Sequence, residues 1–240
     1  MTGDLAGQTV VLIGGSAGIG LETARRARQE GAEVVLVGRD AARLERAAVD
    51  LGAKGTAALD ATDAAAVAGF FDGWERIDHV LVTAGGPHYV PLLEMDADQV
   101  RDALADHVVM ALDVARAAAP RMPPGGSLVL MGGTGGRKIR KGLGLMSAAT
   151  AVLPPFTATL ALELAPVRVN LIAAGFVDTP LSASLLGDQL DERRAELRAT
   201  LSIGRVVGPA DVAALAVHLM ANTALTGATF DIDGGQQFVA

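Results

Sequence analysis

The stretch that decides the fold reads Leu12-Ile13-Gly14-Gly15-Ser16-Ala17-Gly18-Ile19-Gly20. It follows an apolar run, residues 9–13, that is typical of a buried strand, and it precedes a helical pattern over residues 21–27. The glycines at 14, 18 and 20 therefore fall in a strand-to-helix turn, where a missing Cβ lets a pyrophosphate approach the backbone amides. Their spacing is G-x-x-x-G-x-G rather than the commoner G-x-G-x-x-G, so taken alone they also fit a plain turn.

Similar apolar runs alternate with helical patterns along the whole chain. Strands are expected at residues 9–13, 33–39, 56–59, 79–83, 127–131, 168–173 and 229–232. Helices are expected at residues 21–30, 41–51, 63–71, 98–119 and 143–164, with a last helix capped by Asp211. Continuous apolar strands that alternate with helices indicate a parallel sheet covered on both faces. The sequence therefore predicts an α/β, doubly wound parallel sheet of the Rossmann type, with three layers.

No linker, repeat or low-complexity run divides the 240 residues, so a single domain over residues 1–240 is expected. A polar, helix-forming insertion at about residues 180–205 is interpreted as a lid over the substrate. Apolar residues make up 50% of the chain and aromatic residues only 3%, so the core must be aliphatic. No uninterrupted apolar run approaches the ~18 residues that a membrane-spanning helix needs, and Met1-Thr2-Gly3-Asp4 does not resemble a signal peptide.

Composition also excludes several classes of function. The chain has no cysteine, which rules out a disulfide framework and a thiol nucleophile. Its four histidines are scattered, so no metal site is expected. A net charge of −7 and few aromatic residues argue against binding to nucleic acid or to an anionic membrane. A cytoplasmic protein follows as the expectation.

Several short motifs follow the expected strands in order. They are Gly14-x-x-x-Gly18-Ile19-Gly20, Leu59-Asp60-Ala61-Thr62-Asp63, Ala84-Gly85, Arg116-Ala117-Ala118-x-Pro120-x-Met122, Leu160-Ala161-x-Glu163-Leu164-Ala165, Arg168-Val169-Asn170, Gly175-x-Val177-x-Thr179-Pro180 and Asp233-Gly234-Gly235. Through these motifs the chain resembles the short-chain dehydrogenase/reductase family over nearly its full length. The resemblance implies an oxidoreductase that uses a nicotinamide cofactor.

The resemblance also implies which residues bind that cofactor. The pyrophosphate and adenosine ribose would be surrounded by Gly14, Ser16, Gly18, Ile19 and Gly20. The rest of the cofactor would meet Asp60 at the adenine with Ala61 beside it, Thr83, Ala84 and Gly85 along the adenosine and ribose, and Val177 and Thr179 at the nicotinamide amide.

The end of the second strand bears on the choice between NAD(H) and NADP(H). Sites selective for NAD place a carboxylate there to hold the ribose hydroxyls. In this chain the place is Gly38, which cannot repel a phosphate, and Arg39 follows with a planar fork of donors. We interpret the pair as a site for the 2′-phosphate of NADP(H). The alternative is a solvated Arg39 that pairs with Asp40.

The reaction centre departs from the family pattern. By resemblance the family's Asn falls on His107, its Ser on Gly133 with Thr134 next to it, and its Tyr-x-x-x-Lys on Met146 to Thr150. Methionine has no exchangeable proton, and threonine has no positive charge to stabilise a phenolate. The usual acid–base route is therefore excluded, and the active site is expected to be non-standard.

Two residues next to this centre are the candidates for catalysis. Thr134 could hydrogen bond a substrate carbonyl, and the His107 imidazole can exchange a proton near neutral pH. A hydrogen-bonded structural role is the alternative for His107, because it lies in an apolar helix. The basic run 137–141 could attract an anionic substrate or bring a lysine to the nicotinamide, or it could be a solvated loop. Tyr89, with His88, could line the edge of the pocket.

Three functions remain open from the sequence. The first is an NADP(H)-dependent oxidoreductase with a non-standard proton source and an unidentified small-molecule substrate. The second is a non-catalytic NADP(H)-binding sensor or subunit, and the third is a non-redox isomerase or lyase that uses the same pocket. The family resemblance also implies a homodimer or homotetramer, paired through helices 98–119 and 143–164. Pro154-Pro155 would disturb the second of these helices.

Overall fold

The computed structural model describes residues 3–86, 89–137 and 141–239. Within these ranges all strands belong to one parallel sheet with the order β3-β2-β1-β4-β5-β6-β7. The strands are β1 Thr9–Ile13, β2 Glu33–Gly38, β3 Gly55–Ala58, β4 His79–Val82, β5 Ser127–Gly133, β6 Arg168–Ala174 and β7 Thr229–Ile232. Each one falls where the apolar pattern predicts it, with ends that differ by a residue or two.

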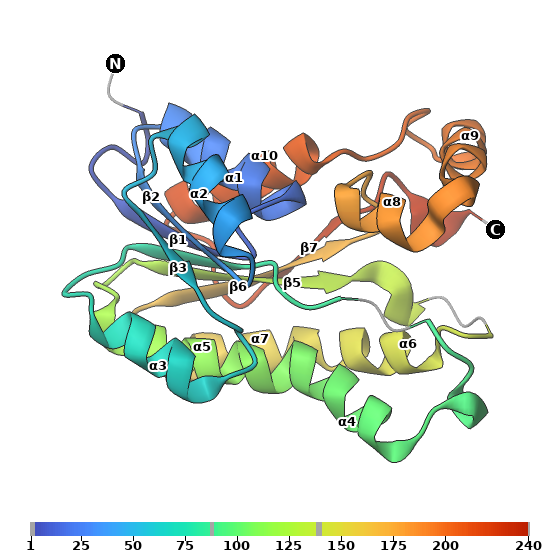
Figure 1. Cartoon of the computed structure of the whole chain (residues 1–240), viewed down its shortest axis with the longest axis horizontal. Helices are drawn as coiled ribbons and strands as arrows, with labels where there is room; N and C mark the ends of the chain where they lie inside the picture. The colour runs from blue at the N-terminus through green and yellow to red at the C-terminus, as the bar shows by residue number, and fades with distance from the viewer. Residues whose placement is uncertain (1–2, 87–88, 138–140, 240) are drawn as a thin grey trace.

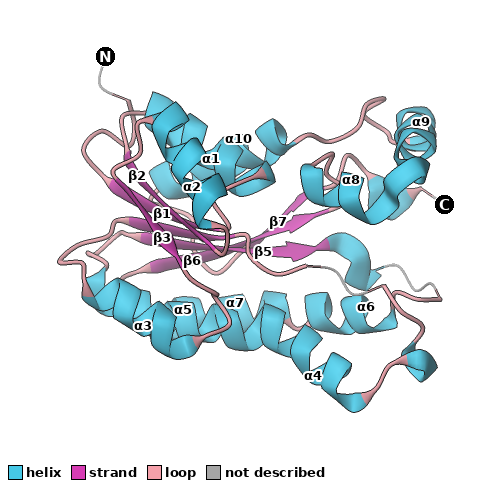
Figure 2. Cartoon of the chain, in the orientation of Figure 1, coloured by secondary structure: helices cyan, strands magenta, loops and turns pink. Residues whose placement is uncertain are grey.

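Helices cover both faces of the sheet (Figure 1). On one face lie α1 Gly18–Gln29, α2 Ala41–Leu51 and α10 Pro209–Ala221. On the other side lie α3 Ala64–Asp72, α4 Ala97–Leu104, α5 Met110–Ala118, α6 Gly144–Ala151 and α7 Leu153–Glu163. This arrangement confirms the predicted doubly wound, three-layer fold. The predicted insertion forms α8 Pro180–Leu186 and α9 Leu190–Thr200, which lie beyond the carboxyl ends of the strands (Figure 2).

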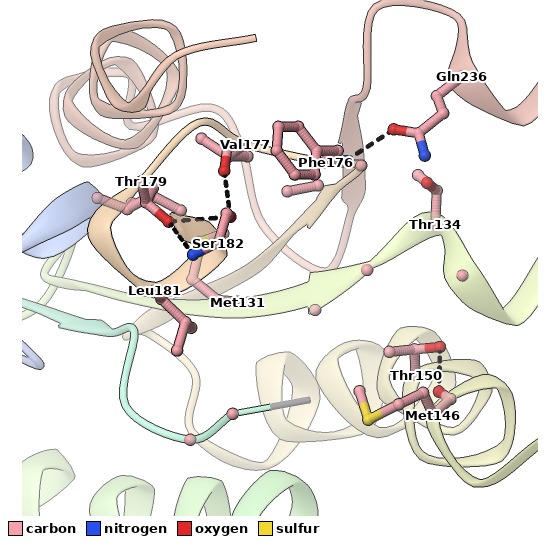
Figure 3. A pocket seen from close by; sticks show the side chains of 18 of the residues that line it. Met131, Thr134, Met146, Thr150, Phe176, Val177, Thr179, Leu181, Ser182 and Gln236 are labelled. Atoms are coloured by element: carbon pink, nitrogen blue, oxygen red, sulfur yellow. Dashed lines mark hydrogen bonds between the residues drawn. The ribbon is translucent and has the colours of Figure 1, made fainter. Parts of the chain in front are cut away.

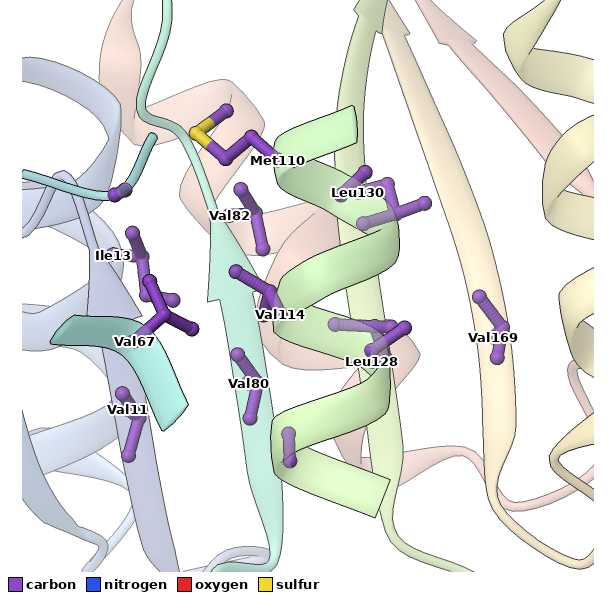
Figure 4. Packing of buried hydrophobic residues seen from close by; sticks show 14 of the residues in the cluster. Val11, Ile13, Val67, Val80, Val82, Met110, Val114, Leu128, Leu130 and Val169 are labelled. Atoms are coloured by element: carbon purple, nitrogen blue, oxygen red, sulfur yellow. The ribbon is translucent and has the colours of Figure 1, made fainter. Parts of the chain in front are cut away.

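The core consists of two aliphatic clusters separated by the sheet. Along β1, Val11 and Ile13 face the α3–α5 side, while Val10 and Leu12 face α1 and α10. Figure 4 shows the first cluster, which joins Val114 of α5 with side chains from β1, β4, β5 and β6. Full burial of one such side chain stabilises the fold by roughly 1.5–3 kcal/mol. The strands read as continuous apolar runs because both of their faces are covered.

Aspartates cap two helices, but the predicted cap of the last helix is wrong. Asp40 and Asp63 accept hydrogen bonds from backbone amides in the first turns of α2 and α3. Asp211, by contrast, lies inside the first turn of α10, and Gly208 is the N-cap. The helix begins earlier because Pro209 has a helical φ and needs no amide partner at the first position. The Asp211 carboxylate still accepts from the Gly208 amide at 2.9 Å.

The two long predicted helices are both interrupted. A π-helical turn, Ala105–Val109, separates α4 from α5, and Val152 separates α6 from α7. The break at Val152 has a direct cause, because Pro154 and Pro155 lack the amide hydrogens that would continue the backbone ladder of α6. The predicted extents are close to those observed. The break at Val152 confirms the predicted disturbance by Pro154-Pro155, whereas the π-helical turn in the first helix was not predicted.

Segment Gly144–Glu163 is long and apolar enough to cross a membrane by length and composition alone, with a mean hydropathy of 1.5. In the fold it forms α6 and α7, and α7 packs against β6. Buried positions make up 39% of its most apolar window. A helix that covers a sheet satisfies the same length and composition test, so the finding does not by itself indicate a membrane span.

Candidate active site

A cavity of about 510 Å³ opens at the carboxyl ends of the central strands. This is the edge at which open parallel sheets bind ligands. The cavity is lined by these predicted site residues: Ile19, Thr83, Ala84, Gly85, His107, Gly133, Thr134, Met146, Thr150, Val177 and Thr179. The remaining predicted residues lie outside the cavity at the ends of β1, β2 and β3: Gly14, Ser16, Gly18, Gly20, Arg39, Asp60 and Ala61. The first group contains all the residues predicted for the reaction centre and the nicotinamide, together with part of the set predicted along the adenosine and ribose.

The glycine-rich turn is shaped by close approaches of the backbone. Gly14 has φ +93°, and a Cβ at Gly14 would overlap the hydroxyl oxygen of Thr83. A Cβ at Gly20 would overlap the Gly14 carbonyl oxygen. Thr83 Oγ1 also donates to the Ile13 carbonyl oxygen at 3.1 Å, which fixes the end of β4 against the turn. Ala17, the N-cap of α1, supplies no side-chain cap, so the first amides of this helix can bind an anion.

The adenosine end carries one unpaired cation. Arg39 is exposed directly after β2 and forms no ion pair within the described residues. The alternative pairing with Asp40 does not form, because the Asp40 carboxylate accepts from the Arg43 backbone amide at 2.9 Å and its other oxygen lies 3.5 Å from the Arg43 guanidinium. Asp60 accepts from the Thr62 amide at 3.0 Å, and this hydrogen bond helps to lower the Asp60 pKa.

The segment assigned to the nicotinamide amide folds over the glycine-rich turn. The Val177 carbonyl oxygen accepts from Ser182 Oγ at 2.6 Å, and Thr179 Oγ1 accepts from the Ser182 backbone amide at 3.2 Å (Figure 3). A Cβ at Gly18 would lie 3.5 Å from Thr179 Cβ, an ordinary contact. Thr179 therefore lies directly beside the glycine-rich turn and also lines the cavity.

Three of the places predicted for the family's catalytic residues, Gly133, Met146 and Thr150, line one cavity, and Thr134 beside them presents a hydroxyl group. Thr134 follows the end of β5 and is 5% exposed, and its hydroxyl group has no partner among the described residues. Met146 contributes a thioether to the cavity wall. The Thr150 hydroxyl donates to the Met146 carbonyl oxygen at 2.7 Å. Gly133 leaves room beside Thr150, since a Cβ there would lie 3.5 Å from Thr150 Cγ2.

His107 is both hydrogen-bonded within its helix and exposed to the cavity, so it fits both the structural and the catalytic role predicted for it. It lies in the π-helical turn, and its Nδ1 donates to the Ala103 carbonyl oxygen at 2.9 Å. This hydrogen bond assigns the proton of the neutral ring to Nδ1 and leaves Nε2 as an acceptor. The half-buried ring also lines the cavity. His107 is thus a structurally held imidazole at the edge of the candidate site.

The described residues of the basic run 137–141 contribute no free positive charge to the cavity. Arg137 pairs with Asp231 and donates to the Gln237 side-chain oxygen at 2.7 Å, so its charge is neutralised. The Arg137 guanidinium lowers the pKa of Asp231. Lys141 is exposed and does not line the cavity, and residues 138–140 lie outside the described residues, as does His88.

Tyr89 and Arg193 lie at the rim of the cavity. Burial raises the pKa of the Tyr89 phenol, and the positive charge of Arg193 opposes that rise. Arg193 pairs with Glu196 at 2.6 Å, and both line the cavity. The rim therefore carries charged groups that compensate each other, while most of the wall is apolar.

Gln236 is a cavity residue that the sequence reasoning missed. Its side-chain oxygen accepts from the Phe176 backbone amide at 2.7 Å (Figure 3). A signal was available, because Gln236 directly follows the Asp233-Gly234-Gly235 motif after the last strand. The carboxyl ends of all strands in a parallel sheet lie at one edge, where ligands bind. A residue that follows any of these strands is therefore a candidate for the binding site, even when its strand is the last in the sequence.

Comparison with known proteins agrees with this geometry. A family described as enoyl-(acyl carrier protein) reductase matches residues 14–237. The chain is 34% identical to an uncharacterized oxidoreductase of Mycobacterium tuberculosis, over 96% of this chain and 92% of that protein. It is 30% identical to the short-chain dehydrogenase/reductase ATR9 of Stachybotrys chlorohalonatus, over 96% and 97% of the two chains. A solved small-chain dehydrogenase in complex with NADPH has a TM-score of 0.83 at 26% identity, over 97% and 99%.

The family-wide match and the identity over nearly the full length settle the class. This chain belongs to the short-chain dehydrogenase/reductase family. It is an oxidoreductase of that type, and the family binds a nicotinamide cofactor.

Proposed function

We propose that the chain is an NADP(H)-dependent oxidoreductase whose active site lacks the family's usual proton-transfer groups. The observation that carries the cofactor choice is the unpaired Arg39 guanidinium beside Gly38. A Cβ at Gly38 would lie 3.6 Å from Ser16 Oγ, so the missing side chain leaves space beside this hydroxyl group, and Arg39 is the next residue along the chain. Within the described residues the Ser16 hydroxyl forms no hydrogen bond. A 2′-phosphate fits this set of donors, and a similar dehydrogenase is known in complex with NADPH.

Calorimetric titration with NADPH and NADH tests the cofactor choice. Replacement of Arg39 by alanine removes a charge-assisted contact worth roughly 1.5–3 kcal/mol, or roughly 10- to 150-fold in NADPH affinity. NADH affinity should stay unchanged. The matched control is Arg46→Ala, an exposed arginine of α2 that should leave both affinities unaltered. Equal affinity for the two cofactors in the wild-type chain would refute the assignment.

The apolar wall favours an uncharged, largely apolar carbonyl compound as substrate. Along the described part of the cavity wall, Arg193 and Glu196 pair with each other, and Arg137 of the basic run is neutralised by Asp231. These pairs favour a neutral substrate over an anionic one. NADPH, when bound, supplies the hydride, and the chain supplies a dry cavity and the Thr134 hydroxyl near the carbonyl. The insertion α8–α9 would act as the lid, since Leu181, Leu185 and Leu197 line the cavity.

A non-catalytic NADP(H)-binding protein is the second candidate. It is favoured by Met146 and by the commitment of the Thr150 hydroxyl to its own helix. A scan of carbonyl, imine and alkene substrates for NADPH oxidation separates the two candidates. Turnover of one class supports the oxidoreductase, whereas tight NADPH binding without turnover of any class supports the sensor or subunit.

The same helices that cover one side of the sheet also support a homo-oligomer. Leu162 of α7 is 81% exposed, and Val109 in the π-helical turn and Val152 between α6 and α7 are exposed as well. Single exposed apolar residues are common on protein surfaces, so the family resemblance is the main ground for an interface here. We propose a homodimer or homotetramer assembled through this side of the molecule.

A further inference from the structure

The Gln236 carboxamide is held in one orientation at the cavity wall. Its Oε1 accepts from the Phe176 amide, which identifies the other amide atom as the NH₂ donor. Gly175 makes this contact feasible, because a Cβ there would lie 2.6 Å from Gln236 Oε1. The amide oxygen is thus occupied by the backbone, and the amide nitrogen is left for the cavity.

The turn that carries Gln236 is itself anchored. Asp233 is buried, and its two carboxylate oxygens accept from the Gly235 amide at 2.8 Å and from the Gln237 amide at 3.0 Å. The Asp233 carbonyl oxygen accepts from the Gln236 amide at 3.0 Å. These three hydrogen bonds fix the backbone of the turn η6 Gln236–Phe238 after β7. The Asp-Gly-Gly motif therefore positions a side chain as well as ending a strand.

The turn that carries Gln236 also contacts the turn that carries Thr134. The turn η4 Thr134–Arg137 contacts η6, and Arg137 bonds both Gln237 and Asp231. In Figure 3 the Gln236 carboxamide points toward Thr134, with its nitrogen on that side. No hydrogen bond joins the two side chains, and among the described residues neither the Thr134 hydroxyl nor the Gln236 nitrogen has a partner. Two neutral donors therefore converge at one place in an apolar cavity.

We propose that Gln236 Nε2 and Thr134 Oγ1 together bind the carbonyl oxygen of the substrate. Thr134 is buried and Gln236 is half-buried at the cavity wall, and both donors are free to bind a ligand. A carbonyl oxygen accepts two hydrogen bonds, so it can pair with both of them. The same pair holds the negative charge that develops on that oxygen when the carbonyl is reduced, as preorganised donors do in a dry site. Gln236 thus selects substrates that carry an acceptor oxygen. This inference rests on the proposed oxidoreductase function.

Binding of two probes of similar shape tests the pair. Acetophenone carries a C=O group where α-methylstyrene carries C=CH₂. Their dissociation constants are measured by ligand-observed NMR, with and without NADPH, and the C=O stretch of bound acetophenone is recorded by infrared spectroscopy. The wild-type chain should prefer acetophenone, and its C=O stretch should lie below the value in hexane. Gln236→Glu keeps an acceptor for the Phe176 amide but removes the donor, so it should reduce the preference about tenfold.

Thr134→Val should also reduce the preference about tenfold, and both variants should return the C=O stretch toward its hexane value. The controls are Gln29→Glu, a matched charge change on the exposed end of α1, and Thr157→Val, a matched hydroxyl loss outside the cavity. Equal binding of the two probes to the wild-type chain, binding of neither, or an unchanged preference in Gln236→Glu would overturn the inference. The affinity of the same samples for NADPH is measured separately. A chain that does not bind NADPH but prefers acetophenone would contradict the proposed function and leave the inference about Gln236 and Thr134 intact.

Discussion

The hydroxyl group of Thr150 donates to the backbone carbonyl oxygen of Met146 at 2.7 Å. These are the two residues of α6 that the sequence resemblance predicts at the family's Tyr and Lys places. Their contact is internal to the helix, so α6 presents a thioether and no free proton donor or cation from these two positions to the cavity. The chain has the fold of a short-chain dehydrogenase/reductase, and the predicted loss of the usual acid stays a prediction that the following experiments test.

Restoring the missing groups should raise the rate of ketone reduction. The combined change Gly133→Ser, Met146→Tyr and Thr150→Lys supplies the hydroxyl, the phenol and the ammonium group, and Gly133 has room for a Cβ. Positioned acid–base groups contribute about 10²–10⁴-fold, so NADPH-dependent reduction of acetophenone should rise at least tenfold. The rate is followed by NADPH absorbance. The same triple change with phenylalanine at position 146 lacks the phenol and should stay at the wild-type rate, and equal rates for both triple variants would contradict the argument.

Thr134→Val and His107→Phe should each lower turnover at least tenfold once a substrate is found, because each removes a polar group next to the reaction centre. NADPH affinity should not weaken, since neither residue lies at the adenosine end. Steady-state kinetics and calorimetry on the same preparations separate the two effects. If both variants keep full activity, the assignment of these residues to the reaction centre is wrong.

The sequence predicts the parts of this molecule that depend on local chemistry. Gly14 and Gly20 predict a close approach between backbone segments, and the structure shows which atoms a Cβ at each position would overlap. Other features depend on contacts between distant segments. The Gln236–Phe176 bond spans 60 residues, so no local pattern reveals it. The π-helical turn at His107 depends on how α4 and α5 pack, and its place was predicted as an ordinary helix.

His79 should make the protein less stable as the pH falls from about 6.5 to about 4. The ring is 3% exposed, with Nδ1 2.9 Å from Ser127 Oγ and Nε2 near Gln8, and burial lowers its pKa from 6.5 to about 4. In that window the unfolded chain binds a proton that the folded chain excludes, which costs up to about 3 kcal/mol at the acid end. Urea unfolding at several pH values measures the slope.

The matched comparison for this slope uses two variants. His79→Gln should flatten it, because the titrating group is gone. His218→Gln, at an exposed position of α10, should leave the slope as in the wild-type chain. A wild-type slope that persists in His79→Gln would show that other groups cause the pH dependence.

Thr157→Val should stabilise the fold. Thr157 lies fully buried in α7, and its hydroxyl oxygen has no hydrogen-bond partner among the described residues. An unsatisfied buried polar atom costs about 1–3 kcal/mol, and valine has nearly the same shape without the hydroxyl group. Urea unfolding should therefore give a free energy of unfolding about 1 kcal/mol or more above wild type. Thr157→Ala, which also leaves a cavity, should be less stable than Thr157→Val, and a destabilised Thr157→Val would indicate that the hydroxyl group has a partner in solution.

Leu162→Glu should shift the protein from an oligomer toward a monomer. Leu162 of α7 is 81% exposed, and Val152 and Val109 are exposed on the same side of the sheet. A glutamate placed in an interface there would bury an unpaired charge away from water, which is unfavourable. Light scattering across micromolar concentrations should give a dimer or tetramer mass for the wild-type chain and a lower mass for Leu162→Glu. The matched control is Val49→Glu on α2, which is 75% exposed on the opposite face of the sheet and should leave the mass unaltered. A monomer mass for the wild-type chain at every concentration, or an equal loss of assembly in Val49→Glu, would mean that α7 does not form the interface.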